Sequence, residues 1–116
     1  SRQRPQKPDK PLFRQHHGQY LTCEINSNLM NEFYFTYILE SEKDGNKYAG
    51  YTKDLNLRFE QHNRGLVEST KDRRPLKLIY FEACLSQADA LKREKYFKTH
   101  YGKMFLKNRL KSYFTG

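Results

Sequence analysis

Residues 33–65 read FYFTYILESEKDGNKYAGYTKDLNLRFEQHNRG, and this stretch decides the fold. Aromatic and aliphatic residues dominate positions 33–40, as they do in a β-strand, and extended character resumes at 47–51. The polar, glycine-containing segment 42–46 between them is typical of a turn. The sequence therefore predicts a β-hairpin.

A helix is predicted directly after this hairpin. Thr52 or Asp54 can cap its N-terminus, and apolar residues then recur at helical spacing as far as His62. Gly65 is placed to end the helix in a left-handed conformation, which glycine adopts without steric cost.

The remaining sequence predicts one more strand and two more helices. Residues 76–84 contain a short apolar run, which favours a buried strand. A capped helix is expected to begin at Ser86 and to run to about Tyr101, where Gly102 interrupts it, and a short helix is expected over 103–111. The order β-β-α-β-α-α predicts an α/β fold, a small three-stranded sheet flanked by helices.

The composition of the chain favours a polyanionic partner. The 116 residues include 22 lysines and arginines against 13 acidic residues, a net charge of +9. Such a balance suits nucleic acid or an anionic membrane surface. No apolar run is long enough for a spanning helix, and no secretory signal is recognisable. Only Cys23 and Cys84 occur, in unlike surroundings, so we expect a cytoplasmic protein in a reducing compartment.

The first part of the chain differs from the rest. Residues 1–29 hold three of the four prolines, five basic and two acidic residues, and almost no apolar periodicity. We expect a disordered basic arm there, followed by one compact domain over residues 30–116. An alternative stays open, in which the arm lies outside the functional domain and Met30 starts a compact protein.

Two charged residues lie on helix faces that otherwise are apolar. Arg58 adjoins Phe59 on the inward face of the first predicted helix. On the second, Glu94 shares a stripe with Ala90, Leu91, Phe97 and Tyr101. Because a buried unpaired charge is costly, such residues indicate either a site for phosphate and a divalent cation or simply an ion pair between the two side chains.

Three further side chains have ordinary interpretations as well as functional ones. His62 beside an apolar face is more often a hydrogen-bonded core residue than a reactive group. Tyr37 and Tyr48 would on their own be strand aromatics, which are common in a chain with nine tyrosines.

The ordered set as a whole resembles the GIY-YIG nuclease superfamily, over roughly residues 33–110. Phe35-Thr36-Tyr37 matches the first signature at its tyrosine, and Tyr48-Ala49-Gly50 matches the second at tyrosine and glycine. Arg58 falls at the family's arginine, eight residues after that glycine. Glu94 stands at the place of the metal-ligating glutamate, and Asn108 falls near a late catalytic asparagine or glutamine.

Residues 69–80 are similar to the small stand-alone bacterial members, which are related to the excision-repair incision nuclease domain. The chain departs from the signatures at three positions. Phe35 replaces glycine, Thr36 replaces isoleucine, and Ala49 replaces the central isoleucine of the second signature. These positions shape or pack strands, so we expect the chemistry to survive the changes.

The resemblance implies a divalent-metal-dependent endonuclease. Glu94 would bind Mg²⁺ (or Mn²⁺), and Arg58 would hold phosphate oxygens. Tyr37 would take a proton from the attacking water, and Tyr48 would orient that water or bind the phosphate. Free tyrosine has a pKa of about 10. Tyr37 therefore needs the metal or Arg58 to stabilise its phenolate, or needs His62 to relay the proton onward.

Basic residues suggest phosphate contacts without base readout, and hence little sequence specificity. The predicted nucleic-acid-binding residues are Lys71, Arg73, Arg74, Lys77 and Arg93, with further lysines at 92, 95, 98, 103 and 107. The expected partner is DNA, branched, damaged or single-stranded, as in DNA repair; RNA is not excluded, and no membrane is expected. Two alternatives remain: a catalytically inactive nucleic-acid-binding module and an RNA-associated accessory protein.

Overall fold

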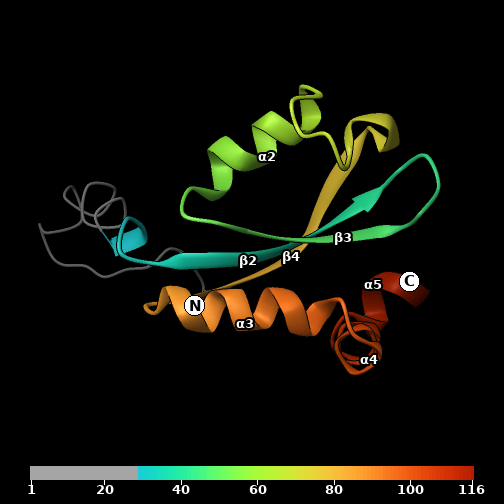
Figure 1. The fold of residues 1–116 in the computed structure, drawn as a ribbon. Coiled ribbons are helices and arrows are strands. Elements are labelled where there is room, and N and C mark those ends of the chain that lie inside the picture. Colours follow the sequence, from blue (N-terminus) through green and yellow to red (C-terminus); the bar gives the residue numbers. More distant parts are fainter. Residues whose placement is uncertain (1–28) are drawn as a thin grey trace, which may run out of the picture. The chain divides into compact units, whose positions relative to one another are not determined.

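The computed structural model describes residues 29–116, and within them Phe33–Gly116 forms one compact unit. The arm predicted for the first 29 residues lies outside the described residues, apart from Leu29. The unit contains a three-stranded antiparallel sheet in the order β3-β2-β4 (Figure 1). β2 (Tyr34–Ser41) is the central strand, and β3 (Lys47–Thr52) and β4 (Leu76–Cys84) are the edges.

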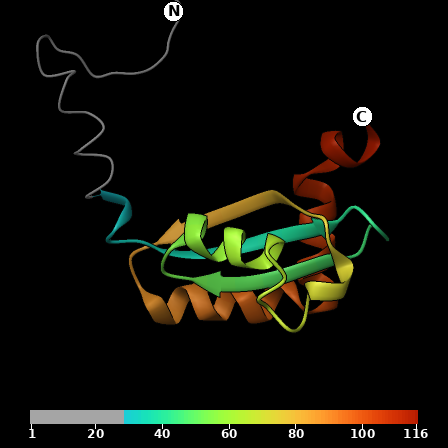
Figure 2. The same cartoon turned by 90° about the horizontal axis from the view of Figure 1, so that it is seen from above.

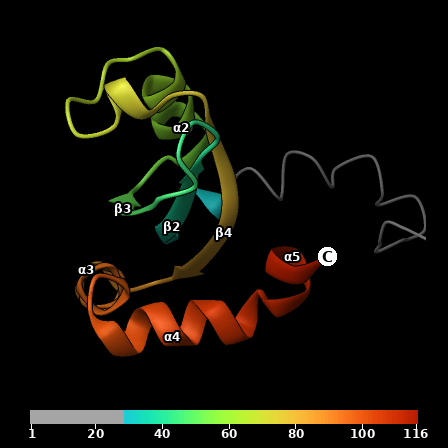
Figure 3. The same ribbon diagram turned by 90° about the vertical axis from the view of Figure 1, so that its right-hand side faces the viewer.

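Helices cover both faces of the sheet. α2 (Leu55–Asn63) lies on one face, and Figure 2 views the sheet from that side. α3 (Gln87–Phe97) and α4 (His100–Arg109) lie on the other face, and α5 (Lys111–Thr115) follows them (Figure 3). The predicted three-stranded α/β order is thus confirmed, with α5 and a short 3₁₀ turn at Lys71–Arg73 as additions.

The alternation of side chains along β2 creates two separate cores. Tyr37 and Leu39 point to the α2 side, where they pack with Leu76 and with partly buried residues of β3, β4 and α2. Ile38 points to the opposite side and packs with Ala49, Phe97 and Leu106. The position of Tyr37 in β2 therefore places its side chain on the α2 face of the sheet.

Both ends of α2 follow the sequence prediction. The Asp54 side chain accepts a hydrogen bond from the Leu57 backbone N–H at 3.1 Å, which caps the first turn. Gly65 has φ +78°, in the left-handed region where a Cβ would be strained. Of the two candidate caps, the structure uses Asp54, and Thr52 instead bonds to the backbone of Asp54.

The break between the last long helices lies earlier than expected. α3 ends at Phe97, and the Thr99 side chain caps α4 by accepting from the backbone N–H of Gly102. Gly102 is thus inside α4, not between two helices. A Cβ at Gly102 would overlap the backbone carbonyl of Tyr96, so this glycine lets α4 approach the end of α3 closely.

Two expectations about which residues are buried are wrong. Both failed because burial depends on which other elements pack against a strand or helix. Strand β4 is an edge strand, not a buried one, and its Phe81 is 41% exposed. Tyr101 belongs to α4 and is 74% exposed, and Leu91 is exposed as well, so the stripe expected around Glu94 reduces to Ala90 and Phe97. Among the helices of residues 29–116, none has the length and hydrophobicity that crossing a membrane needs.

Candidate functional site

A hydrogen-bonded chain of three buried polar side chains lies between the sheet and α2. The Tyr37 hydroxyl is 2.8 Å from Nε2 of His62, and Nδ1 of His62 is 2.7 Å from the Thr70 hydroxyl. None of the three residues is more than 1% exposed. The Tyr48 ring packs on His62 with 5.2 Å between ring centroids. Strand β2, strand β3, α2 and the loop after α2 thus meet at one point.

Arg58 joins this cluster from α2. Its Nη1 donates to Oε1 of Gln61 at 3.1 Å, and its positive charge lowers the pKa of His62. No ion pair between Arg58 and Glu94 occurs within residues 29–116, so the alternative of a simple buried ion pair is wrong for the part of the chain that the structure describes. The guanidinium lies beside the phenol and is half-buried.

Gly50 makes room for the Tyr37 phenol. The two residues are direct cross-strand partners of β2 and β3. A Cβ at Gly50 would overlap the ring and the hydroxyl oxygen of Tyr37. Because any other residue would push the phenol away from His62, the position of the Tyr37 hydroxyl depends on this glycine.

Glu94 approaches from α3, on the opposite side of the sheet. Its only ion-pair partner within the described residues is Lys98, at 3.4 Å, and the two side chains are 22% and 57% exposed. Exposed pairs of this kind stabilise a protein by about 0–1 kcal/mol, so Lys98 does not block the carboxylate. The Thr36 hydroxyl donates to the carbonyl of Ala90 at 2.7 Å and ties α3 to the central strand one turn before Glu94.

Burial keeps Tyr37 and His62 neutral at pH 7. Burial raises the pKa of Tyr37 to about 12; Arg58 opposes this shift, and the charges of Tyr48 and Glu94 add to it. Burial, and then the positive charge of Arg58, lowers the pKa of His62 to about 4. Of these causes, Glu94 contributes least to the pKa of Tyr37.

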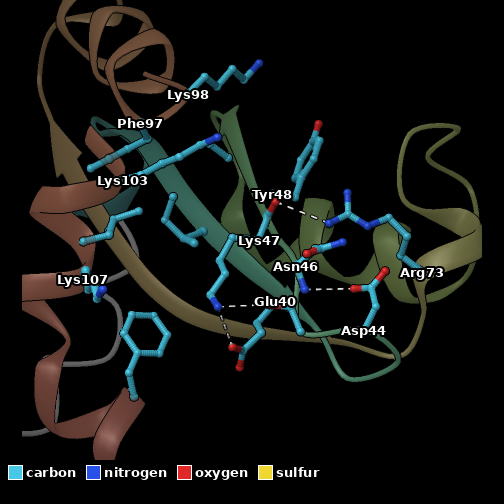
Figure 4. A pocket seen from close by; sticks show the side chains of 15 residues that line it. Glu40, Asp44, Asn46, Lys47, Tyr48, Arg73, Phe97, Lys98, Lys103 and Lys107 are labelled. Atoms are coloured by element: carbon cyan, nitrogen blue, oxygen red, sulfur yellow. Dashed lines mark hydrogen bonds and ion pairs between the residues drawn. The ribbon is translucent and has the colours of Figure 1, made fainter. Parts of the chain in front are cut away.

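A basic hollow adjoins the cluster and includes Tyr48 in its lining. Five cationic side chains line it: Lys47, Arg73, Lys98, Lys103 and Lys107. Figure 4 shows Lys98, at the end of α3, with Lys103 and Lys107 of α4 on one side and Arg73 on the other. Glu40 and Asp44 are the two acidic lining residues, and Glu40 pairs with Lys47 at 3.2 Å. The hollow therefore carries a net positive charge next to the tyrosines.

This arrangement of two strand tyrosines, a helix arginine and a later glutamate agrees with a comparison against known families. The model of the GIY-YIG catalytic domain matches residues 33–111. The chain belongs to the GIY-YIG family. Membership places it among nucleases, which act on nucleic acid and generally depend on a divalent metal.

Similar proteins carry names that state no activity. The UPF0213 proteins of Staphylococcus aureus strains Mu3 and Mu50 are both 47% identical to this GIY-YIG chain over 68 residues, which cover 58% of it and 82% of each relative. A UPF0213 protein of Bacillus halodurans, solved by NMR in solution, is 32% identical with a TM-score of 0.41, and the match covers 64% of this chain and 81% of that one.

The donor set of this GIY-YIG domain fits a magnesium ion held by few protein ligands. Within residues 29–116 there is no group of three or more His, Cys, Asp or Glu side chains that could enclose a metal. Mg²⁺ keeps several waters and binds through one or two carboxylates together with substrate phosphates, and Glu94 is the carboxylate that the resemblance assigns to it. The partial exposure of Glu94 leaves room for those waters.

The structure brings together four of the six predicted catalytic residues: Tyr37, Tyr48, Arg58 and His62. Glu94 lies on α3, on the opposite side of the sheet, and its only side-chain hydrogen bond within the described residues is with Lys98. Asn108 is exposed, two residues after buried Leu106 on α4, and no hydrogen bond within residues 29–116 joins it to the cluster. Its catalytic role stays a prediction from resemblance alone.

The predicted nucleic-acid-binding residues are placed differently from one another. Arg73 lines the basic hollow. Lys71 pairs with Glu68, and Arg74 donates to the Lys71 carbonyl. The Lys77 amine lies over the Tyr113 ring.

The prediction that Arg93 binds nucleic acid is corrected, because its guanidinium already pairs with a carboxylate of the protein. It donates to both carboxylate oxygens of Glu82, at 2.5 and 3.1 Å, and lies over the rings of Tyr96, Phe97 and Phe105. Arg93 is therefore a packing residue and not a free phosphate ligand.

Sequence reasoning did not give Thr70 a role. It lies in the polar loop eight residues after His62, and no helical or strand periodicity relates the two. The only available signal was a hydroxyl residue in a loop that follows a helix carrying an inward histidine.

Proposed function

We propose that this GIY-YIG domain is a divalent-metal-dependent endonuclease that hydrolyses phosphodiester bonds in DNA with little sequence specificity. The observation that carries the proposal is the convergence of Tyr37, Tyr48 and Arg58 beside a basic hollow. A protein that only bound nucleic acid would need the basic hollow and would not need these groups.

Each residue of the cluster has a distinct task in this mechanism. Arg58 offers a planar, permanently charged donor that can bind two phosphate oxygens at once. Tyr48, which lies between the buried cluster and the hollow, orients the scissile phosphate or the attacking water. Glu94 would hold Mg²⁺ (or Mn²⁺), and the bound ion would supply Lewis-acid stabilisation of the charge that develops on the phosphate.

Tyr37 takes the proton of the attacking water in this proposal. Its pKa of about 12 makes the phenol a poor base at neutral pH, so the phenolate must be stabilised or the proton passed on. Arg58 is the donor that stabilises the phenolate directly, and His62 is the neighbour that could receive the proton. The 2.8 Å between the Tyr37 hydroxyl and Nε2 of His62 is compatible with the second route.

A cleavage assay tests the proposal. The protein is incubated with branched, nicked and linear DNA and with RNA of matched length, in Mg²⁺, in Mn²⁺ or in excess EDTA. We expect strand breaks in DNA with either metal and none with EDTA. Intact substrates in every metal condition, together with measurable binding, would instead support an inactive binding module; preferential binding of RNA without cleavage would support the accessory protein.

The lysines of the hollow give a separate prediction about binding. Replacing Lys103 and Lys107 together with glutamine should make the dependence of log K on log salt shallower by about 2, because each lost phosphate contact changes the slope for duplex DNA by about 0.9. Neither lysine has an ion-pair partner within the described residues, so the changes disturb little else.

The matched control replaces Lys92 and Lys95, two exposed lysines of α3 that the sequence also suggested for phosphate contacts but that lie outside the hollow. This control removes two positive charges, as the Lys103 and Lys107 variant does. It should leave the slope of log K against log salt nearly unchanged. Equal slopes for the two double variants in fluorescence anisotropy titrations would show that the hollow is not where the phosphates bind.

A further inference from the structure

An aromatic ring lies among the cations of the basic hollow. Phe114 of α5 lines the hollow together with Lys47, Lys103 and Lys107, and its side chain is only partly buried. The family match ends at residue 111, so membership of the GIY-YIG family gives Phe114 no role. A surface that bound only phosphate would need the cations and would not need a partly exposed phenyl ring beside them.

Contacts with the hairpin hold the Phe114 ring in place. The Lys47 Nζ lies 4.6 Å from the centre of the ring, and the same nitrogen is 3.2 Å from one carboxylate oxygen of Glu40. The Tyr113 hydroxyl donates to the other oxygen of Glu40 at 2.5 Å. Two adjacent residues thus attach α5 to the end of β2 and the start of β3. A ring that is ordered before binding loses little conformational entropy when a ligand packs on it.

The hollow has an apolar part as well as a charged one. Four residues of one core reach its lining: Ile38, Ala49, Phe97 and Leu106. A nucleic acid strand matches both parts, because its phosphates are anionic and its bases present flat π-faces. Tyr48 also lines the hollow, so a strand bound there adjoins the candidate site.

Base stacking makes this combination sensitive to whether the DNA is paired. In a duplex the bases stack on one another, so a ring in the hollow can reach only phosphates, sugars and base edges. In a single strand, a base can stack on an aromatic side chain while the neighbouring phosphates contact lysines. Such stacking tolerates any base, which agrees with the proposed lack of sequence specificity.

We infer that Phe114 is a specificity-determining residue, which stacks on an unpaired base and so favours single-stranded stretches of DNA over duplex. Such stretches occur in single strands and in branched or gapped DNA. The inference rests on the proposed function, because it takes the hollow as the place where the phosphates of DNA bind. It assigns Phe114 to binding, and the chemistry stays with the cluster around Tyr37.

Oligomers with and without bases test the stacking apart from cleavage. Fluorescence anisotropy in excess EDTA measures binding of a thymidine oligomer and of an abasic oligomer of equal length, which carries the same phosphates. We expect the wild type to bind the thymidine oligomer about tenfold more tightly, as one stacked base would give. Equal affinities would overturn the inference and leave the proposed function intact. No binding of either oligomer would overturn both.

Substitutions of Phe114 then locate the stacking. Phe114→Leu keeps an apolar side chain and removes the flat ring, whereas Phe114→Tyr keeps the ring. We expect Phe114→Leu to lose most of the preference for the thymidine oligomer, with binding of duplex DNA within twofold of wild type. Phe114→Tyr should retain the preference.

Tyr101→Leu is the matched control. Tyr101 is an aromatic residue of α4 that is 74% exposed and does not line the hollow, so this substitution should leave the preference unchanged. A Phe114→Leu protein with the wild-type preference would overturn the inference. An equal loss of affinity for duplex DNA would overturn it as well, because the loss would then come from a disturbed hollow and not from a missing stack.

Discussion

Glu94→Gln is expected to lower the rate of DNA cleavage about 10³-fold while binding of DNA stays within twofold. Glutamine has the size of glutamate and lacks its charge, so the change removes the carboxylate proposed to hold the metal and little of the packing. Metal-ion stabilisation of a phosphoryl transition state is worth several kcal/mol, and about 4 kcal/mol corresponds to 10³ in rate. Single-turnover cleavage measures the rate, and titration with catalytically silent Ca²⁺ measures binding.

The control for this variant is Glu60→Gln. Glu60 is also a helix glutamate paired with a residue four positions on, Arg64, and it is 61% exposed. This substitution should leave cleavage unchanged. A Glu94→Gln protein that cuts at the wild-type rate would remove Glu94 from the site and leave the basic hollow as a binding surface only.

Tyr37→Phe is expected to lower kcat by about 10²–10⁴, the usual contribution of a general base. The ring of phenylalanine fills the same space between Gly50 and His62, so the sheet is retained. The variant also leaves one nitrogen of His62 without a partner in the interior, which should cost about 1–3 kcal/mol of unfolding free energy. Denaturant titration measures this loss separately from the kinetics.

Tyr80→Phe provides the comparison for Tyr37→Phe. Tyr80 is a partly buried tyrosine of β4 whose hydroxyl donates to Glu82 at 3.1 Å, so the substitution again removes one hydrogen-bonded hydroxyl from the sheet. It should change kcat by less than about twofold. If both variants lost activity equally, the effect of Tyr37 would be one of stability and not of chemistry.

Local patterns predicted the hairpin and α2 correctly, and they failed where two helices meet. Asp54 and Gly65 act through the backbone of their own helix, so their roles are readable from neighbouring residues. The end of α3 depends on Thr99 capping α4 and on the close contact between Gly102 and Tyr96. That contact exists only after both helices have packed, so Gly102 was misread as a helix break.

In the candidate site, too, some features could be predicted from the sequence and others depended on how distant elements pack. The resemblance supplied the reactive residue types, and the structure brings Tyr37, Tyr48, Arg58 and His62 together. Asn108 was named from a register that no local pattern fixes, and it lies exposed on α4. Spacing alone could not predict which lysines and arginines are free to bind phosphate. A basic side chain can form an ion pair with an acidic residue far away in the sequence.

By itself, the sequence determined the order of the elements and membership of the GIY-YIG family. The tertiary structure alone decided that Arg93 pairs with Glu82, that the one ion-pair partner of Glu94 within residues 29–116 is Lys98, and that Thr70 contacts His62. The physical reason is the separation along the chain of the residues that interact. Backbone conformation and side-chain alternation follow from neighbouring residues, whereas these pairings arise only when strands, helices and loops distant in the chain have packed.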